Sequence, residues 1–392
     1  MKQHFELNKS LRKKVRIIMP KIYYFSTSCH QDTNITLKEL LGSYDIHEIS
    51  TDSINTKGVL IKESLDYLLS KKLSDLQGFI KSVPVQDKTP LLKSGNEKGF
   101  VYNSVIFNND TLNIIAGLNA VDNSNNVEKV FALLNYHNIK CARMGVYKPR
   151  TNPYTFQGRG KLCLNNIFSL ADKYDIKAIA MEVLSERHVD EILNCLTTGN
   201  YNTGVILQIG TRNAQNYELL KYVGSIGEHP VLYKRGFGIS FAESVQACEY
   251  IAKSGNKKII FCLRGLKSYH AAPHRNICDF AHIPVVKREL GLLTCADPSH
   301  AIGEYNLDTH NISDIAHVTA QAVIAGANCL LIDIHPTPSN SLVDHKQAID
   351  FEQFNLLLSD ISLCRKSYIQ RQELYSSAKA FKLKPELALD TL

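Results

Sequence analysis

The chain has 392 residues, of which 44% are hydrophobic and 21% are charged, and its formal net charge is +7. This composition excludes a disordered or fibrous protein, and the length predicts two or three domains. The Lys and Arg residues are scattered except in segments 9–16 and 147–160. That pattern favours small anionic ligands in a site over a nucleic acid, which usually requires a basic stripe.

We expect a cytoplasmic protein that does not enter a membrane. The apolar segment 15–25 is short and contains Pro20 and Lys21, so it does not resemble a secretory signal. We find no apolar run of the ~18 residues needed to span a bilayer. The ten cysteines form no C-x-x-C pair, and several stand within apolar runs, which is typical of buried, reduced thiols.

The first hundred residues predict a small α+β module. Strands are expected over 21–28, 45–51 and 58–64, and helices over 35–44 and 65–83, the second of them broken near Ser74. The order strand, helix, strand, strand, helix is typical of a ferredoxin-like module. We assign residues 1–88 to this module, for which we consider a regulatory role. Residues 89–110 are assigned to a linker that leads into the next domain.

From residue 112 onward, short apolar runs alternate with amphipathic helical segments. Eight strands are expected over 112–119, 140–146, 177–184, 203–210, 230–236, 258–265, 292–300 and 329–336. The runs are apolar throughout, as in strands covered on both faces. They predict a (β/α)8 TIM barrel over residues 111–364, with a doubly wound open sheet as the alternative. The C-terminal tail, 365–392, is expected to be a helix or a frayed end.

Cations gather at the expected C-terminal ends of these strands, where barrel enzymes build their active sites. They are Arg143, Lys148, Arg150, Arg212, Lys234, Arg235 and Arg264. One such cation could cap a strand and face water, but a ring of them with few local acids requires mobile anions. Arg is suited to gripping phosphate and carboxylate through two hydrogen bonds. We therefore predict a site for two phosphates and a carboxylate.

The last two strands end instead in carboxylates and histidines. These residues are Asp297, His300, Asp333, His335 and Asp344. His300, Asp333 and Asp344 together offer one imidazole and two carboxylates, a donor set that suits a divalent metal. A histidine held by hydrogen bonds for purely structural reasons is the alternative.

Several segments at the strand ends also carry a family resemblance. They are AGLNAVD, YKPRTNPYTFQG, QIGTRNAQNYELL, PVLYKRGF, LRG, DPSH and IDIHPTP…LVDHKQAIDF, in that order within residues 110–355. They resemble the type I 3-deoxy-D-arabino-heptulosonate 7-phosphate (DAHP) synthases, most closely the beta subclass, which is related to the 3-deoxy-manno-octulosonate 8-phosphate synthases. The resemblance implies a homo-oligomeric barrel transferase that condenses phosphoenolpyruvate with erythrose 4-phosphate in the shikimate pathway.

The resemblance also implies a role for each charged residue at the strand ends. The phosphate and carboxylate of phosphoenolpyruvate would be held by Arg143, Lys148, Arg212, Lys234 and Arg264. The aldose phosphate would be bound, and its aldehyde oriented, by Lys148, Arg150 and Thr151. The implied catalytic residues are Lys148, Glu182, Asn119 and His300, with Glu182 near the water that attacks C2. Two anionic reactants need such charged clamps to meet in line.

The chain departs from the family at the implied metal site, which uses a Cys, a His, a Glu and an Asp. His300 and Asp344 match, but Asn119 stands at the Cys position and Asp333 at the Glu position. An amide supplies neither charge nor a soft donor, so we expect either no cofactor or a weakly bound divalent metal. Metal-independent octulosonate phosphate synthases carry an Asn at this place. Leu263 is a second departure, because the beta subclass usually has Glu there.

Three functions stay open on the sequence alone. The first is DAHP synthesis from phosphoenolpyruvate and erythrose 4-phosphate, which the complete KPRT of residues 148–151 favours. The second is the same chemistry on a different phosphorylated aldose in specialised or surface-sugar metabolism, which Asn119 and Asp333 favour. The third is a non-catalytic regulatory relative, against which the complete set of cations argues.

Overall fold

The computed structural model of the chain describes residues 99–380 continuously and, before them, residues 21–26, 39–41, 46–49, 56–61, 67–76, 79–84 and 89–93. The basic segment 9–16 and most of the helix expected over 35–44 lie outside these residues. The chain divides into two compact units, Met1–Gly95 and Asn96–Leu392, which are described separately. The division lies within the residues assigned above to the linker.

The first unit contains a four-stranded antiparallel sheet in the order β2-β3-β1-β4. Its elements are β1 (Lys21–Ser26), β2 (Ile46–Ile49), β3 (Thr56–Ile61), α3 (Tyr67–Ser74), β4 (Phe79–Pro84) and α4 (Pro90–Lys93). Alternate residues of the two central strands, including Tyr23, Phe25 and Val59, are buried together with Leu73 of α3. This period-2 burial is the mark of a sheet with one covered face.

One element of this unit was predicted only in part: the break expected near Ser74 is confirmed, but the residues after it were wrongly predicted as helix. The helix expected over 65–83 ends at Ser74, and residues Phe79–Pro84 form β4, which pairs with β1. Strand pairing supplies the backbone partners that a continued helix would have supplied. The described elements therefore follow the order strand, strand, strand, helix, strand, and the helix expected before β2 lies mostly outside the described residues.

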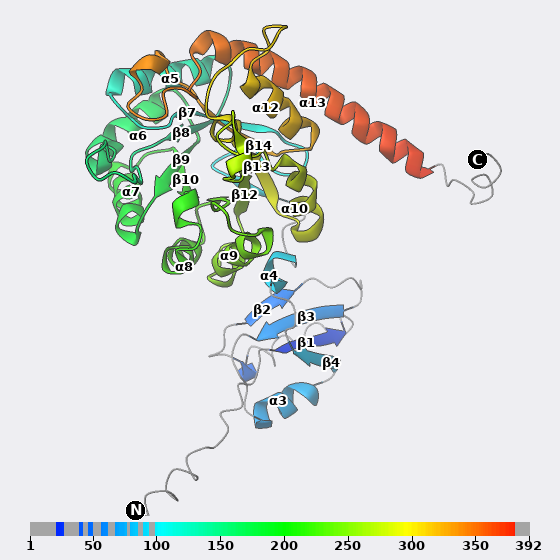
Figure 1. Cartoon of the computed structure of the whole chain (residues 1–392). Helices are drawn as coiled ribbons and strands as arrows, with labels where there is room; N and C mark the ends of the chain where they lie inside the picture. The colour runs from blue at the N-terminus through cyan, green and yellow to red at the C-terminus, as the bar shows by residue number, and fades with distance from the viewer. Residues whose placement is uncertain are drawn as a thin grey trace, which may run out of the picture. The chain divides into compact units, whose positions relative to one another are not determined.

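The second unit is built on a closed barrel of eight parallel strands (Figure 1). The strands are β7 (Asn113–Leu118), β8 (Cys141–Met144), β9 (Ala178–Val183), β10 (Gly204–Ile209), β11 (Val231–Lys234), β12 (Ile259–Leu263), β13 (Leu293–Ala296) and β14 (Cys329–Asp333). Each lies within a segment predicted as a strand, so the TIM barrel is confirmed and the open sheet is excluded. Adjacent strands are consecutive in sequence, and β14 closes the barrel against β7.

Helices surround the barrel in the alternation that the sequence predicts. They are α5 (Ser124–Tyr136), α6 (Leu164–Lys173), α7 (Glu186–Gly199), α8 (Tyr217–Ile226), α9 (Phe241–Lys253), α10 (Ile283–Leu290), α11 (Pro298–Ile302), α12 (Asp314–Ile324) and α13 (Phe351–Ala380). Local signals begin them: Ser240 and Glu243 form a capping box at α9. The helix α13 packs on α12 and continues beyond residue 364. Among the described residues, no helix is long and apolar enough to cross a membrane.

A short hairpin covers the N-terminal ends of the barrel strands. It consists of β5 (Phe100–Tyr102) and β6 (Val105–Phe107). Its turn residues, Asn103 and Ser104, have φ of 45° and 67°, as the two-residue turns that match the strand twist require. The Asn103 side chain donates to the carbonyls of Lys177 and Asn202, where β9 and β10 begin. The hairpin therefore leaves only the C-terminal face of the barrel for a site.

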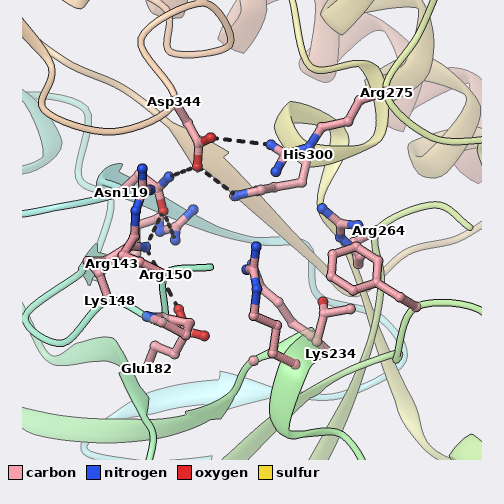
Figure 2. Close-up of a pocket in the computed structure, with 15 residues that line it drawn as sticks. Asn119, Arg143, Lys148, Arg150, Glu182, Lys234, Arg264, Arg275, His300 and Asp344 are labelled. Atoms are coloured by element: carbon pink, nitrogen blue, oxygen red, sulfur yellow. Dashed lines mark hydrogen bonds and ion pairs between the residues drawn. The ribbon is translucent and has the colours of Figure 1, made fainter. Parts of the chain in front are cut away.

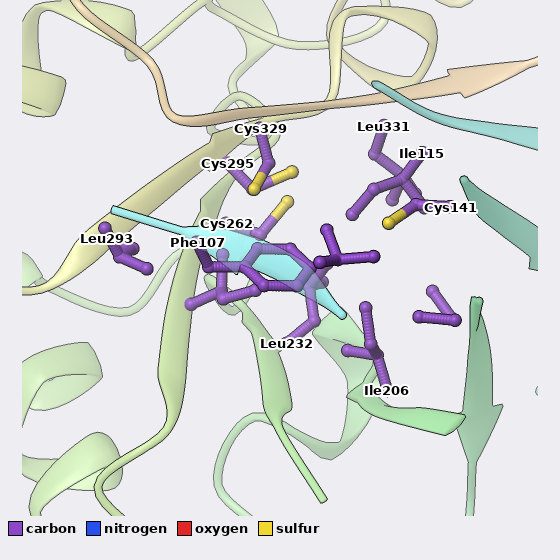
Figure 3. Packing of buried hydrophobic residues seen from close by; sticks show 14 residues of the cluster. Phe107, Ile115, Cys141, Ile206, Leu232, Cys262, Leu293, Cys295, Cys329 and Leu331 are labelled. Carbon is purple, nitrogen blue, oxygen red and sulfur yellow. The ribbon is translucent and has the colours of Figure 1, made fainter. Parts of the chain in front are cut away.

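Apolar side chains fill the barrel interior above this hairpin. Phe107 is fully buried there and packs with residues from the inner faces of the strands (Figure 3). Four cysteines belong to the same cluster, namely Cys141, Cys262, Cys295 and Cys329. Burial raises the pKa of Cys141 to about 12, so this thiol behaves as a small apolar group.

Candidate active site

A pocket opens at the C-terminal ends of the barrel strands (Figure 2). Its empty volume is about 540 Å³, including the open solvent at its mouth. Its lining comprises Asn119, Arg143, Lys148, Pro149, Arg150, Glu182, Gly210, Thr211, Arg212, Lys234, Phe237, Arg264, Arg275, His300 and Asp344. Seven of these side chains are Lys or Arg and two are carboxylates. The excess of cations in a walled pocket attracts anions.

Asn119, directly after β7, lies at the centre of a hydrogen-bond network in this pocket. Its Oδ1 accepts from Arg143 NH2 at 2.8 Å and from Lys148 Nζ at 2.9 Å. Its Nδ2 donates to Asp344 Oδ2 at 2.7 Å. The amide oxygen thus faces two cations and the amide nitrogen faces a carboxylate, which fixes the orientation of the side chain.

Lys148 is the lysine that donates to Asn119. Its side chain is buried, and Nζ lies 3.8 Å from Glu182 Oε2. Burial lowers the pKa of Lys148 to about 8, and the charge of Glu182 opposes this shift only in part. The ammonium group is therefore able to give up a proton near neutral pH, and an anionic ligand would stabilise its charged form.

Gly210 leaves space for the side chain of Glu182, the acid that lies beside Lys148. A Cβ at residue 210 would come within 1.8 Å of Glu182 Oε1. The glycine at the end of β10 therefore allows the Glu182 carboxylate to lie across the neighbouring strand end.

Asp297, at the end of β13, organises a second group of polar side chains. It is fully buried, and its Oδ2 accepts from Lys234 Nζ at 2.7 Å. Its Oδ1 lies 2.9 Å from His300 Nδ1 and accepts the His300 backbone N–H at 3.2 Å. Burial would raise the pKa of Asp297, but the charges of His300 and Lys234 hold it well below its usual range.

This arrangement also directs the imidazole of His300. With Nδ1 beside Asp297, the Nε2 atom faces Asp344 Oδ2 at 3.8 Å. Burial lowers the pKa of His300, against the raising effect of Asp297. The contact with Asp297 therefore fixes the orientation of the ring and turns Nε2 toward the pocket that His300 lines.

Arg264, directly after β12, has no carboxylate partner in the described part of the chain. It is 2% exposed, and its Nε and NH1 atoms have no hydrogen-bond partner there. Its Cζ lies 4.8 Å from the centroid of the Phe237 ring, and Arg212 Cζ lies 5.7 Å from the same centroid. Burial lowers the pKa of Arg264. An arginine with unused buried donors at a pocket is a site for an anion.

The carboxylate of Asp333 is already engaged by neighbouring donors. Arg143 NH1 donates to Asp333 Oδ1, and Gln347 Nε2 donates to Oδ2 at 2.9 Å. His300 Nδ1 lies 3.8 Å from Oδ2, but this nitrogen also faces Asp297. Asp333 is 1% exposed and does not line the pocket.

Asp344 is engaged in the same way, by Asn119 on one oxygen and by Arg275 NH1 at 3.4 Å on the other. Among the described residues, no group of three or more His, Cys, Asp and Glu is arranged to hold a metal ion. The donor set of His300, Asp333 and Asp344 does not fit a metal as it lies here, because arginine and amide groups occupy the carboxylate oxygens that would coordinate it.

Most residues predicted from the strand ends line this one pocket. They are Asn119, Arg143, Lys148, Arg150, Glu182, Arg212, Lys234, Arg264, His300 and Asp344. Thr151 is exposed and lies outside the lining. Arg235, also noted at a strand end, is absent from the lining and pairs with Asp279 Oδ2 at 3.1 Å. The roles of all these residues stay predictions.

The cationic loop that follows β8 is stiffened from within. The Lys148 backbone N–H donates to Gln157 O at 3.0 Å, and Gln157 Nε2 donates to Thr155 O at 2.8 Å. Arg150 Nε donates to Thr155 Oγ1 at 3.1 Å. Gly158 has a φ of +96°, and a Cβ there would come within 2.1 Å of a backbone oxygen. Hydrogen bonds and a glycine turn thus add to the stiffness that the two prolines of segment 147–160 give the backbone.

Three residues of the site were not singled out from the sequence. Arg275 comes from the loop after η4 (Tyr269–Ala271) and has no strand or motif beside it that would mark it. Gln347 donates to Asp333 from the loop after β14, and it lies within the quoted segment LVDHKQAIDF, although its role was not predicted. Phe237 could have been found, because it directly follows the cations at the end of β11.

Comparison with known proteins relates this geometry to a family. A 253-residue stretch is 36% identical to the phospho-2-dehydro-3-deoxyheptonate aldolase of Thermotoga maritima and covers 64% of this chain and 70% of that protein. A 108-residue stretch is 32% identical to the 2-dehydro-3-deoxyphosphooctonate aldolase of Protochlamydia amoebophila and covers 26% of this chain and 38% of that protein.

The fold is similar as well. The crystal structure of the Thermotoga maritima phospho-2-dehydro-3-deoxyheptonate aldolase (DAHP synthase) aligns with a TM-score of 0.65 at 28% identity, over 89% of this chain and 98% of that one. A truncated form of the same organism's DAHP synthase aligns with a TM-score of 0.60 at 30% identity, over 69% and 93% of the two chains. Residues 85–366 match the DAHP synthetase I family, and the chain therefore belongs to that family.

Proposed function

We propose that this protein condenses phosphoenolpyruvate with erythrose 4-phosphate to give DAHP and phosphate, and that it does so without a tightly bound metal. One observation carries the proposal most directly. The pocket sets seven cations against two carboxylates, and one of those cations, Arg264, has buried donors with no partner in the described residues. Two phosphates and a carboxylate from the two substrates would balance this charge.

Phosphoenolpyruvate would bind on the side of the pocket formed by Arg212, Lys234 and Arg264. Lys234 is held by Asp297 at 2.7 Å, so its position is set before the ligand arrives. Arg264 offers unused donors in a buried place. Such preorganised charge stabilises the phosphate as it leaves, without reorganisation during the reaction.

The aldose phosphate would lie toward the loop after β8, with its phosphate near Arg150 and Thr151 and its aldehyde near Lys148. Carbon–carbon bond formation joins C3 of phosphoenolpyruvate to the aldehyde carbon, and the aldehyde oxygen then needs a proton. Lys148 can supply it, because burial lowers its pKa to about 8. Asn119 Oδ1 holds its Nζ at 2.9 Å, which fixes the donor in place.

Water would then add to C2, where positive charge develops, and its proton would pass to Glu182. The Glu182 carboxylate lies 3.8 Å from Lys148, so both proton-transfer groups would face one reacting centre. The resulting hemiketal phosphate breaks its C2–O bond to phosphate, and the proton of the C2 hydroxyl passes to the departing phosphate, which leaves the ketone of the product. Each proton given up by one group is balanced by the proton taken by the other.

A metal in this family would polarise the aldehyde oxygen when bound. We propose that the cations Arg143 and Lys148, which both donate to Asn119, supply that polarisation here. Arg143 occupies an oxygen of Asp333, and Asn119 occupies an oxygen of Asp344. A weakly held ion would have to displace these contacts. The homo-oligomer and a regulatory role for the ferredoxin-like unit remain proposals on the resemblance alone.

The test is phosphate release from phosphoenolpyruvate with erythrose 4-phosphate, measured with and without a strong chelator. Turnover that survives the chelator would support both parts of the proposal. Turnover that is lost and then restored by a metal would support the reaction but contradict the metal-free site. No turnover in either condition would favour another phosphorylated aldose, which Asn119 and Asp333 leave open, and a panel of four- and five-carbon acceptors would identify it.

A further inference from the structure

The ring of Phe237 lies beside two of the pocket's arginines. Arg264 Cζ is 4.8 Å and Arg212 Cζ is 5.7 Å from the ring centroid. Both distances are within the range at which the negative face of an aromatic ring attracts a cation. Phe237 itself lines the pocket and is partly exposed. The ring therefore contacts the pocket and both guanidinium groups at once.

Other buried cations near the site are stabilised differently. Arg143 is paired with Asp333 and Lys234 with Asp297. Each of these carboxylates consumes hydrogen-bond donors of its cation and cancels its charge. Arg264 has no such partner among the described residues, and its Nε and NH1 donors are unused. A ring face attracts the cation without using its in-plane N–H donors.

We propose that Phe237 is a positioning residue that holds Arg264 and Arg212 as a free pair for one anionic group of the substrate. A carboxylate at this place would compete with the substrate for both arginines, whereas the ring keeps their charge and donors available. The inference rests on the proposed function, in which these arginines bind phosphoenolpyruvate. In this proposal the aromatic character of Phe237, and not its bulk, sets the affinity of the site for the anion.

The chain offers a matched control at Phe241, at the start of α9. Arg235 Cζ lies 5.8 Å from the Phe241 ring centroid, so the aromatic contact is similar. Arg235 is nevertheless paired with Asp279 at 3.1 Å, and neither Arg235 nor Phe241 lines the pocket. Loss of the Phe241 ring should therefore affect packing but not anion binding.

The experiment compares Phe237→Leu, Phe237→Tyr and Phe241→Leu in the full-length protein. Calorimetry measures the dissociation constants of phosphoenolpyruvate and of inorganic phosphate, and steady-state kinetics measure KM and kcat. For Phe237→Leu we expect both dissociation constants and the KM for phosphoenolpyruvate to rise about fivefold to tenfold, with kcat changed less than the KM. Phe237→Tyr keeps an aromatic ring and should bind both ligands as the wild type does. Phe241→Leu should also bind both ligands as the wild type does.

Each contrary result has a defined meaning. Wild-type affinity in Phe237→Leu, no rescue in Phe237→Tyr, or equal weakening in Phe241→Leu would overturn the positioning role. Circular dichroism identifies a variant that fails to fold, and Phe237→Tyr then decides alone, because its affinity must equal that of the wild type. A wild type that binds phosphate but not phosphoenolpyruvate contradicts the proposed function, while the phosphate arm still tests Phe237. A wild type that binds neither contradicts both.

Discussion

Asn119 and Asp344 are joined by a 2.7 Å hydrogen bond from Nδ2 to Oδ2, which connects the residue after β7 to the loop after β14. The bond places an amide N–H group where a cation would approach the carboxylate. Because the same amide accepts from Arg143 and Lys148, one neutral side chain connects the acidic and the basic parts of the site (Figure 2).

We expect Asn119→Cys to increase the affinity for Zn²⁺ or Co²⁺ by at least tenfold, because it removes the N–H group from Asp344 and adds a thiolate donor. Equilibrium dialysis with each metal measures the change directly. Asn119→Ala is the control, since it frees Asp344 without adding a ligand. Equal metal affinity in the two variants would show that the thiolate is not coordinated.

Arg264→Met should abolish turnover and raise the free energy of unfolding. The wild-type side chain is 2% exposed and has unused donors, and such buried unsatisfied groups cost about 1–3 kcal/mol. Methionine retains much of the volume without that cost. Urea unfolding and phosphate-release assays measure the two effects. A variant that is both less stable and active would contradict the idea that Arg264 is retained for anion binding.

The value of kcat/KM should fall as the pH rises through about 8, because the pKa of Lys148 is lowered to about 8 by burial. Below this pH the ammonium is charged and can hold anions and donate a proton; above it both abilities are lost. Saturating phosphoenolpyruvate should move the loss of kcat to higher pH, since a bound anion favours the ammonium.

Lys148→Arg provides the control for this pH profile. Its guanidinium stays protonated over the whole range, so the fall near pH 8 should disappear even where the overall rate is lower. An unchanged profile in Lys148→Arg would assign the titration to another group.

Asp297→Asn should lower the free energy of unfolding by about 3–5 kcal/mol, because it leaves the buried Lys234 ammonium facing a neutral amide. Urea denaturation measures the loss. Asp175→Asn is a suitable comparison, because the Lys140–Asp175 pair is exposed. The backbone φ of Asp175 is 55°, a value that Asn also adopts. That variant should lose at most about 1 kcal/mol. Similar losses in both variants would mean that burial does not increase the contribution of the Lys234–Asp297 pair to the free energy of unfolding.

Phe107→Ala should destabilise the barrel by about 3–5 kcal/mol, since the ring is fully buried among the inner residues of the strands. Val101→Ala on the same hairpin is the control, because Val101 is 63% exposed. Thermal unfolding of both variants would check the prediction. A small effect of Phe107→Ala would mean that the hairpin is not part of the cooperative core.

Some local elements were missed because their signals are weak or are outweighed by pairing partners. Residues 100–107 have the alternation of a hairpin, but the segment is short and follows polar residues that indicate a linker. The β4 strand follows a helical pattern, and only its pairing with β1 distinguishes it from a longer helix. In both places the decisive partners are distant in sequence, so a local window does not contain them.

The sequence by itself determined the barrel and the residues at its strand ends. Continuous apolar runs predict strands covered on both faces, and parallel strands necessarily bring their C-terminal ends to one face. The tertiary structure alone decided how those ends are paired: Asp297 with Lys234, Asp333 with Arg143, and Arg264 with the Phe237 ring. Barrel closure places β14 beside β7, and spacing along the chain does not reveal which donor reaches which carboxylate across it.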